Sequence, residues 1–160
     1  LSLRESADVI LDTSELNIHQ LSNRIAESFS LIETHKLQVT VMSFGFKYGV
    51  PSDADMVADM RFLPNPFWNE ELRPFTGEYP QVAEFVLGQE GAEDFVANYV
   101  AALKPVLRGY LKENKRYATI AIGCTGGKHR SVAVSKRIAA ELAKISDVAV
   151  SLKHRDLGKE

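Results

Sequence analysis

The residues best suited to chemistry lie together in one short stretch, Ile122-Gly-Cys-Thr-Gly-Gly-Lys-His-Arg-Ser-Val132. Its glycines allow positive φ angles and let backbone N–H groups approach a ligand closely. A helix that begins near His129 would add unpaired N–H groups and the positive end of its dipole at the same place. We therefore predict that residues 124–131 form a loop that binds a phosphate-like anion.

The side chains of this loop also suit an anion. Lys128, His129 and Arg130 supply cationic donors, and Thr125 and Ser131 supply hydroxyl groups. A plain strand-to-helix turn with solvated basic residues is the simpler alternative, but such a turn would require fewer glycines and no basic cluster. The predicted ligand-binding residues are Gly123, Cys124, Thr125, Gly126, Gly127, Lys128, His129, Arg130 and Ser131.

The spacing from Cys124 to Ser131 also fits C-x-x-G-x-x-R-S and resembles the phosphate loop of cysteine-dependent phosphatases. There a thiolate attacks phosphorus while loop amides and the arginine hold the equatorial oxygens. Cys124 and Arg130 would then be catalytic; otherwise no catalytic residue is predicted, and Cys124 is a small residue filling a strand end. Gly123 stands where that family usually has a histidine. Candidates for the general acid are Asp53, Asp55 and Asp59.

The elements around the loop follow the order of an α/β protein. A mostly apolar run at 117–122 predicts a buried strand, and 132–144 and 148–152 complete a strand–helix–strand unit. Residue type and spacing predict strands at 38–44 and 56–61 and a helix at 93–111. The predicted fold is an α/β domain with a mostly parallel or mixed sheet and flanking helices. Such sheets bind ligands outside the carboxyl ends of their strands, where the loop lies.

A helical connector is predicted before this domain. A short strand at 7–12 precedes a helix that starts with the capping-box residues Asn17 and Gln20, and its apolar residues recur at helical spacing as far as Ile32. A strand and a helix cannot hide such an apolar stripe by themselves. The stripe must therefore dock on the rest of the chain or on another chain.

The segment 62–80 contains four prolines and several aromatic residues, and is predicted to be a long irregular loop. We interpret Phe67, Trp68 and Phe75 as packing anchors of this loop rather than as stacking platforms. Polar residues of this loop and of the strand ends are expected to reach the ligand, with ordinary surface positions as the alternative. These secondary candidates are Lys47, Tyr48, Arg61, Asn65, Arg73, Thr76, His154 and Arg155.

Composition argues against several classes of protein. The chain has 160 residues and a net charge of −2, so a broadly basic nucleic-acid-binding surface is not expected. No apolar run approaches the roughly 20 residues of a membrane span. The single cysteine cannot form an internal disulfide, which predicts a reducing, cytoplasmic location. His19 and His35 have no cysteine or carboxylate at ligand spacing, so no metal site is predicted.

Longer motifs give the chain a family resemblance. They are Phe44-Gly-Phe-Lys-Tyr-Gly-Val-Pro51, Asp59-Met-Arg-Phe-Leu-Pro-Asn-Pro66, Leu72-Arg-Pro-Phe-Thr-Gly77, the stretch 121–132 and His154-Arg-Asp156. Together they resemble the C-terminal domain of RapZ-like nucleotide-binding proteins, from about residue 37 to the end. Residues 8–17 resemble the last strand and exit of that family's N-terminal P-loop domain. The resemblance implies two parts, with 1–35 as the end of the P-loop domain and its connecting helix, and 36–160 as a ligand-binding domain.

The resemblance also implies a function, that of an adapter and sensor of cell-wall amino-sugar metabolism. The N-terminal domain would bind and hydrolyse ATP or GTP. The C-terminal domain, without a cofactor of its own, would bind glucosamine-6-phosphate or a nucleotide sugar such as UDP-N-acetylglucosamine through the glycine loop. A homo-oligomer and a regulatory protein partner are implied as well. RNA binding is the alternative, but RNA-binding members have a histidine at the position of Tyr48 and a basic tail, whereas this chain ends Asp156-Leu-Gly-Lys-Glu160.

Overall fold

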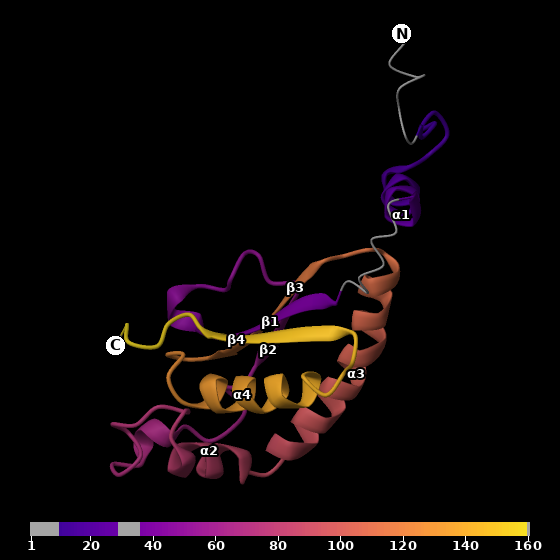
Figure 1. The fold of residues 1–160 in the computed structure, drawn as a ribbon. Coiled ribbons are helices and arrows are strands. Elements are labelled where there is room, and N and C mark those ends of the chain that lie inside the picture. The colour runs from indigo at the N-terminus through magenta and orange to yellow at the C-terminus, as the bar shows by residue number, and fades with distance from the viewer. Residues whose placement is uncertain (1–9, 29–35, 160) are drawn as a thin grey trace.

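The chain is described by a computed structural model that covers residues 10–28 and 36–159. Within these ranges, four strands form one sheet in the order β2-β3-β1-β4, and every neighbouring pair is parallel. The strands are β1 (Leu37–Gly45), β2 (Met56–Asp59), β3 (Tyr117–Cys124) and β4 (Val148–His154). The predicted α/β class with a parallel sheet is thus confirmed (Figure 1).

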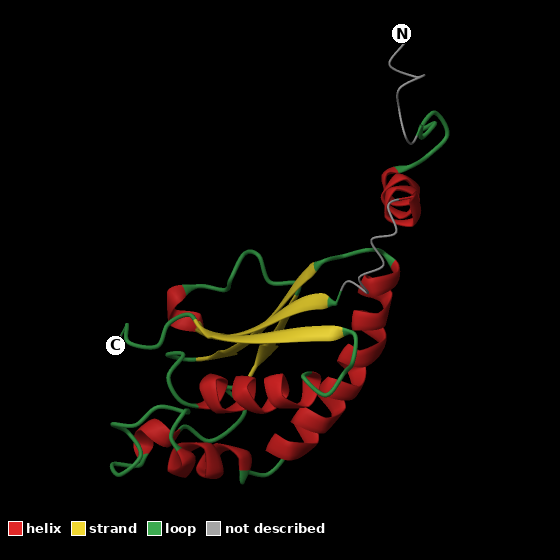
Figure 2. Ribbon diagram, viewed as in Figure 1, coloured by secondary structure: helices red, strands yellow, loops and turns green. Residues whose placement is uncertain are grey.

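Three helices follow β2 in the chain: α2 (Pro80–Leu87), α3 (Ala92–Lys112) and α4 (Arg130–Leu142). α4 packs on β1, β3 and β4, and α2 and α3 pack on α4, as Figure 2 shows. Alternate residues of the two central strands build the core between sheet and helices, because successive side chains point to opposite faces of a strand. Those that are 1% exposed or less include Leu37, Val39, Val41, Ile120 and Ile122.

The opposite face of the sheet is more polar and more exposed over most of its length. Tyr117 is 73% exposed and Val57 is 45% exposed. Toward the carboxyl ends of the strands this face becomes buried, because the ring of Phe44 packs edge-on against that of Phe46 with 4.8 Å between centroids. Within the described residues, this face is buried from Met42 and Ala121 onward, toward the edge where the glycine loop lies.

Helix α1 (Ile18–Ser28) begins with the predicted capping box. The side-chain oxygen of Asn17 accepts the backbone N–H of Gln20, and the Gln20 side chain accepts the backbone N–H of Asn17, both at 2.9 Å. The predicted continuation to Ile32 and most of the predicted strand at 7–12 lie outside the described residues, and 10–12 form no strand.

Several element boundaries differ from the predicted ones. β2 ends at Asp59 instead of residue 61, because the Asp59 carboxylate accepts the backbone N–H of Arg61 and closes a turn. β3 continues past 122 to Cys124, since its last residues pair in register with those of β1. Helix α2 has no counterpart in the prediction. It has eight residues, too few to show periodicity, and Pro80 occupies its first turn, where a missing N–H is tolerated.

Candidate functional site

The glycine loop of this protein runs from Thr125 to His129, between β3 and α4, at the carboxyl edge of the sheet. Helix α4 begins at Arg130, close to the predicted start. Strand β1 ends beside the loop, because Gly45 is the register partner of Cys124. The Pro-rich segment closes the other side, where the Gly77 N–H donates to the Lys128 carbonyl at 2.9 Å.

Glycine stands at Gly123, Gly126 and Gly127 for different structural reasons. This corrects the expectation that all three glycines allow positive φ angles. Only Gly127 has a positive φ, 78°. A Cβ on Gly123 would come 2.5 Å from the rings of Phe44 and Phe46, so this strand glycine makes room for aromatic packing. A Cβ on Gly126 would meet the Lys47 side chain at an ordinary 3.7 Å.

Arg130 is the charged group most firmly fixed in the site. It is 4% exposed, and its guanidinium donates to the Leu63 carbonyl at 2.8 Å and to the Thr125 hydroxyl at 3.3 Å. Its Nε atom is buried without a hydrogen-bond partner. Among the described residues no carboxylate forms an ion pair with Arg130, and Asp59 interacts with it only through longer-range electrostatics. Burying a charge is costly unless other groups compensate it, so this guanidinium is suited to an anionic ligand.

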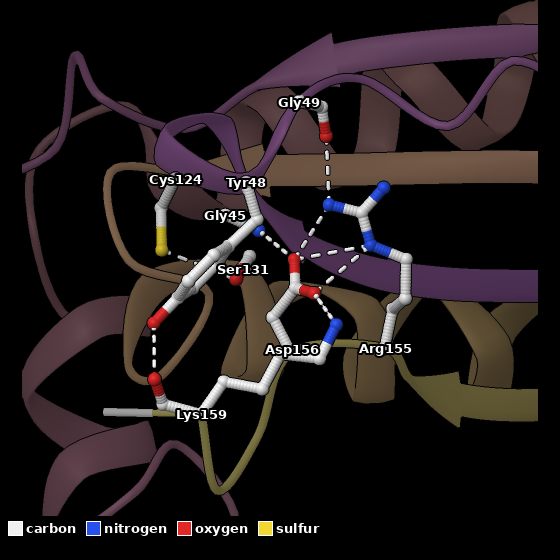
Figure 3. Close-up of polar contacts among 8 residues, drawn as sticks. All are labelled: Gly45, Tyr48, Gly49, Cys124, Ser131, Arg155, Asp156 and Lys159. Carbon is white, nitrogen blue, oxygen red and sulfur yellow. Dashed lines mark hydrogen bonds and ion pairs between the residues drawn. The ribbon is translucent and has the colours of Figure 1, made fainter.

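Cys124 points into the protein next to the loop. Its Sγ atom lies 3.1 Å from the Ser131 hydroxyl, and both residues are buried (Figure 3). Two of the three carboxylates predicted as candidates for the general acid, Asp55 and Asp59, are held in ion pairs. Asp55 directly precedes the amino end of β2, whereas the glycine loop lies at the carboxyl ends of the strands. Its carboxylate pairs with Lys115 at 2.5 Å. The hydrogen bond from Arg61 lowers the pKa of Asp59, which keeps that carboxylate ionised rather than ready to donate a proton.

A cavity of about 400 Å³ opens over the glycine loop, within the usual size range of small-molecule sites. Predicted loop residues and secondary candidates line it together, namely Cys124, Thr125, Gly126, Lys128, His129 and Arg130 with Lys47, Asn65 and Arg73. No carboxylate is among the described lining residues, and within the described chain no cluster of His, Cys, Asp and Glu could hold a metal ion.

The remaining predicted site residues do not line the cavity: Gly123, Gly127, Ser131, Tyr48, Arg61, Thr76, His154 and Arg155. Several of them form hydrogen bonds or ion pairs with the backbone and side chains around the cavity. His154 Nδ1 lies 2.7 Å from the buried Ser43 hydroxyl, and burial lowers its pKa. The Arg61 guanidinium pairs with Asp59 at 2.6 Å and stacks over Phe46. The Tyr48 hydroxyl donates to the Lys159 carbonyl.

Phe67 and Trp68 correct the interpretation of the aromatic residues as packing anchors. Both line the cavity, yet they are 44% and 76% exposed. Phe75 is the one of the three that packs partly buried against the core. Residue type alone does not predict whether a large ring is exposed, because the same ring can be a buried packing anchor or an exposed stacking surface.

Asp156 is a buried residue next to Gly127 of the loop, and it was not among the predicted site residues. Its fully buried carboxylate accepts the Gly45 N–H at 2.8 Å and pairs with Arg155 at 2.7 Å and Lys159 at 2.9 Å (Figure 3). Burial opposes ionisation, but the hydrogen bonds from Arg155, Gly45 and Lys159 outweigh it and lower the pKa of Asp156 to about 2. This Asp156 cluster fixes the end of β1 against Gly127 of the loop.

These features define an α/β domain with a parallel sheet and a basic, glycine-rich loop at its carboxyl edge. The family model of the RapZ C-terminal domain matches residues 37–158, so the chain belongs to this family. A nucleotide-binding protein of Clavibacter michiganensis subsp. michiganensis is 65% identical over 160 residues, covering 100% of this chain and 55% of the relative. One from Leifsonia xyli subsp. xyli is 61% identical over 158 residues, covering 99% and 54%.

The chain spans about half the length of these curated relatives. In the part of the chain that the structure describes, no helix combines the length and the apolar character needed to cross a membrane.

Proposed function

We propose that this chain is the regulatory, ligand-binding domain of a longer nucleotide-binding protein, and that its cavity holds the phosphate of a sugar metabolite. The observation that carries the proposal is the buried Arg130 guanidinium, which reaches the cavity without a carboxylate partner among the described residues. A phosphate on the loop would add charged acceptor oxygens to the neutral oxygens of Arg61, Leu63 and Thr125 that the guanidinium already contacts.

The surroundings of Arg130 support the same ligand class. The loop residues Thr125 and Gly126 and the N-terminus of α4 lie at the cavity, where a helix dipole favours negative charge. Lys47 and Arg73 add positive charge from two other segments. From the family resemblance we propose glucosamine-6-phosphate or UDP-N-acetylglucosamine as the ligand. Hydrolysis of ATP or GTP would belong to the N-terminal part of the relatives' length.

Calorimetric titration of the chain with glucosamine-6-phosphate, UDP-N-acetylglucosamine and inorganic phosphate tests the proposal. We expect measurable binding of at least one sugar ligand, and a loss of roughly tenfold or more in affinity in Arg130→Met, because hydrogen bonds to charged groups contribute about 1.5–3 kcal/mol. Arg137→Met is the matched control, since it removes a cation from the same helix at an exposed site paired with Glu93.

Lys47→Met is a second variant for the case that Arg130→Met unfolds, because Lys47 is exposed and lines the cavity. Absence of heat with all three ligands at millimolar concentration would contradict the proposal. Equal affinities of Arg130→Met and Arg137→Met, with both variants folded, would place the anion elsewhere.

A further inference from the structure

Phe67 and Trp68 form a pair of exposed rings at the cavity, here called the aromatic platform. Their ring centroids are 5.4 Å apart with an interplanar angle of 83°. Both belong to the 3₁₀ turn η2 (Pro66–Trp68), which lies next to α2 in Figure 2. Large apolar rings are normally removed from water, so two neighbouring exposed rings beside a cavity indicate a surface that a ligand covers.

The aromatic platform is held in place although it is exposed. Asn65 caps η2 by accepting the Phe67 N–H at 3.2 Å. Arg73 donates its Nε to the Phe67 carbonyl at 2.8 Å and lies over the Phe67 ring at 4.8 Å from the centroid. A ring pair that is fixed before binding loses little conformational freedom when a ligand stacks on it.

The charges of the cavity indicate what is attached to the stacked group. Lys47, Arg73 and Arg130 bring positive charge from three segments, and the described lining residues include no carboxylate. Such a lining favours a ligand with more negative charge than one phosphate monoester carries. The platform and the cations line one cavity, so one ligand can carry both a planar group and a multiply charged anion.

We propose that the cavity takes a nucleoside diphosphate group, with its phosphates on the glycine loop and Arg130 and its base stacked on the Trp68 ring of the aromatic platform. The inference rests on the proposed function and narrows it, because it favours a nucleotide sugar over a simple sugar phosphate. A nucleotide within an RNA strand offers similar chemistry. The chain's net charge of −2 favours the free nucleotide, since strand binding depends on many phosphate contacts.

Trp68 makes the test direct, because it is the single tryptophan of the chain. UDP, ADP and inorganic pyrophosphate are titrated while the tryptophan emission is recorded, and affinities are measured in parallel by calorimetry. We expect at least one nucleoside diphosphate to quench the emission and to bind about tenfold more tightly than pyrophosphate, within the range that base–aromatic stacking provides. Pyrophosphate has no base and should leave most of the emission unchanged.

Two substitutions and a control complete the test. Trp68→Ala should lower the nucleoside diphosphate affinity about tenfold while leaving pyrophosphate binding unchanged, and Trp68→Phe should restore most of the loss. Tyr117→Ala removes another exposed aromatic ring, on the open face of the sheet, and should change neither affinity.

The outcomes separate this inference from the proposed function. If pyrophosphate binds as tightly as UDP and ADP, or if Trp68→Ala weakens all three alike, the aromatic platform is refuted and the anion site stands. Failure of every anion to bind would refute both. A mixed-sequence single-stranded RNA that binds more tightly than either nucleoside diphosphate, and loses this in Trp68→Ala, would overturn the free-nucleotide ligand in favour of RNA.

Discussion

Gly123 and Gly126 stand three residues apart in the same motif, yet their environments predict opposite effects of an added methyl group. In Gly123→Ala the Cβ would lie 2.5 Å from two aromatic rings, whereas in Gly126→Ala its nearest neighbour is the flexible Lys47 side chain at 3.7 Å. Overpacking a close-packed site typically costs about 1–3 kcal/mol. We expect Gly123→Ala to lose that much unfolding free energy in urea, and Gly126→Ala less than about 0.5 kcal/mol. Equal losses would show that the Phe44 and Phe46 rings move aside without cost.

Individual residues of the site differ in how far the sequence alone could identify them. The loop could be found because its glycines, hydroxyls and cations are contiguous, and Lys47, Asn65 and Arg73, which were predicted as secondary ligand contacts, line the same cavity. The role of Asp156 could not be predicted, because it depends on a hydrogen bond to Gly45, which is 111 residues away in the sequence. Arg155 was predicted as a ligand contact, but its guanidinium pairs with Asp156 and donates to the Gly49 carbonyl.

The element that holds the loop in register is the end of β1, and Asp156 is its anchor. The folded-state pKa of about 2 lies below the ordinary 3.8, so the carboxylate stabilises the fold above pH 4 and this stabilisation is lost as the pH falls toward 2. The difference corresponds to about 2 kcal/mol. We expect Asp156→Asn to lower the unfolding free energy by about this amount at pH 7 and by clearly less at pH 3, measured by urea denaturation.

Asp147→Asn is the control for this pH dependence, because Asp147 is exposed in the turn before β4. It should cost little at either pH. A deficit of Asp156→Asn that is the same at pH 7 and pH 3 would mean that its shape and hydrogen bonds, rather than its charge, hold Gly45.

The order of the strands and helices could be predicted from the sequence, but the residues at which they begin and end could not. Runs of apolar, β-branched and aromatic residues identified the central strands, whose core-facing side chains are buried. The end of β2 depends on a side-chain hydrogen bond, and helix α2 depends on packing against α4. Neither interaction leaves a periodic signal in so few residues.

Helix α1 carries apolar side chains that the rest of the described chain leaves exposed. Ile18 is 78% exposed and Ile25 is 42% exposed, and the buried core of the described residues contains no residue of α1. An isolated helix of 11 residues is marginal in water, so packing must supply its stability. The chain covers about half of its relatives' length, and an exposed apolar stripe of this kind is suited to packing against another protein segment or a second copy of the chain.

The exposure of α1 makes a prediction about how stability is distributed. The double substitution Ile18→Ser and Ile25→Ser should leave the melting temperature of the chain within about 2 °C of the original at low protein concentration, because neither side chain belongs to the core. Val134→Ser is the contrasting variant, since Val134 on α4 is fully buried and its loss should lower the melting temperature by many degrees. Hydrogen exchange should agree, with amides of α1 exchanging far faster than those of α4. If the double substitution instead lowers the melting temperature strongly, and more so at high protein concentration, α1 is already buried against a second copy of the chain.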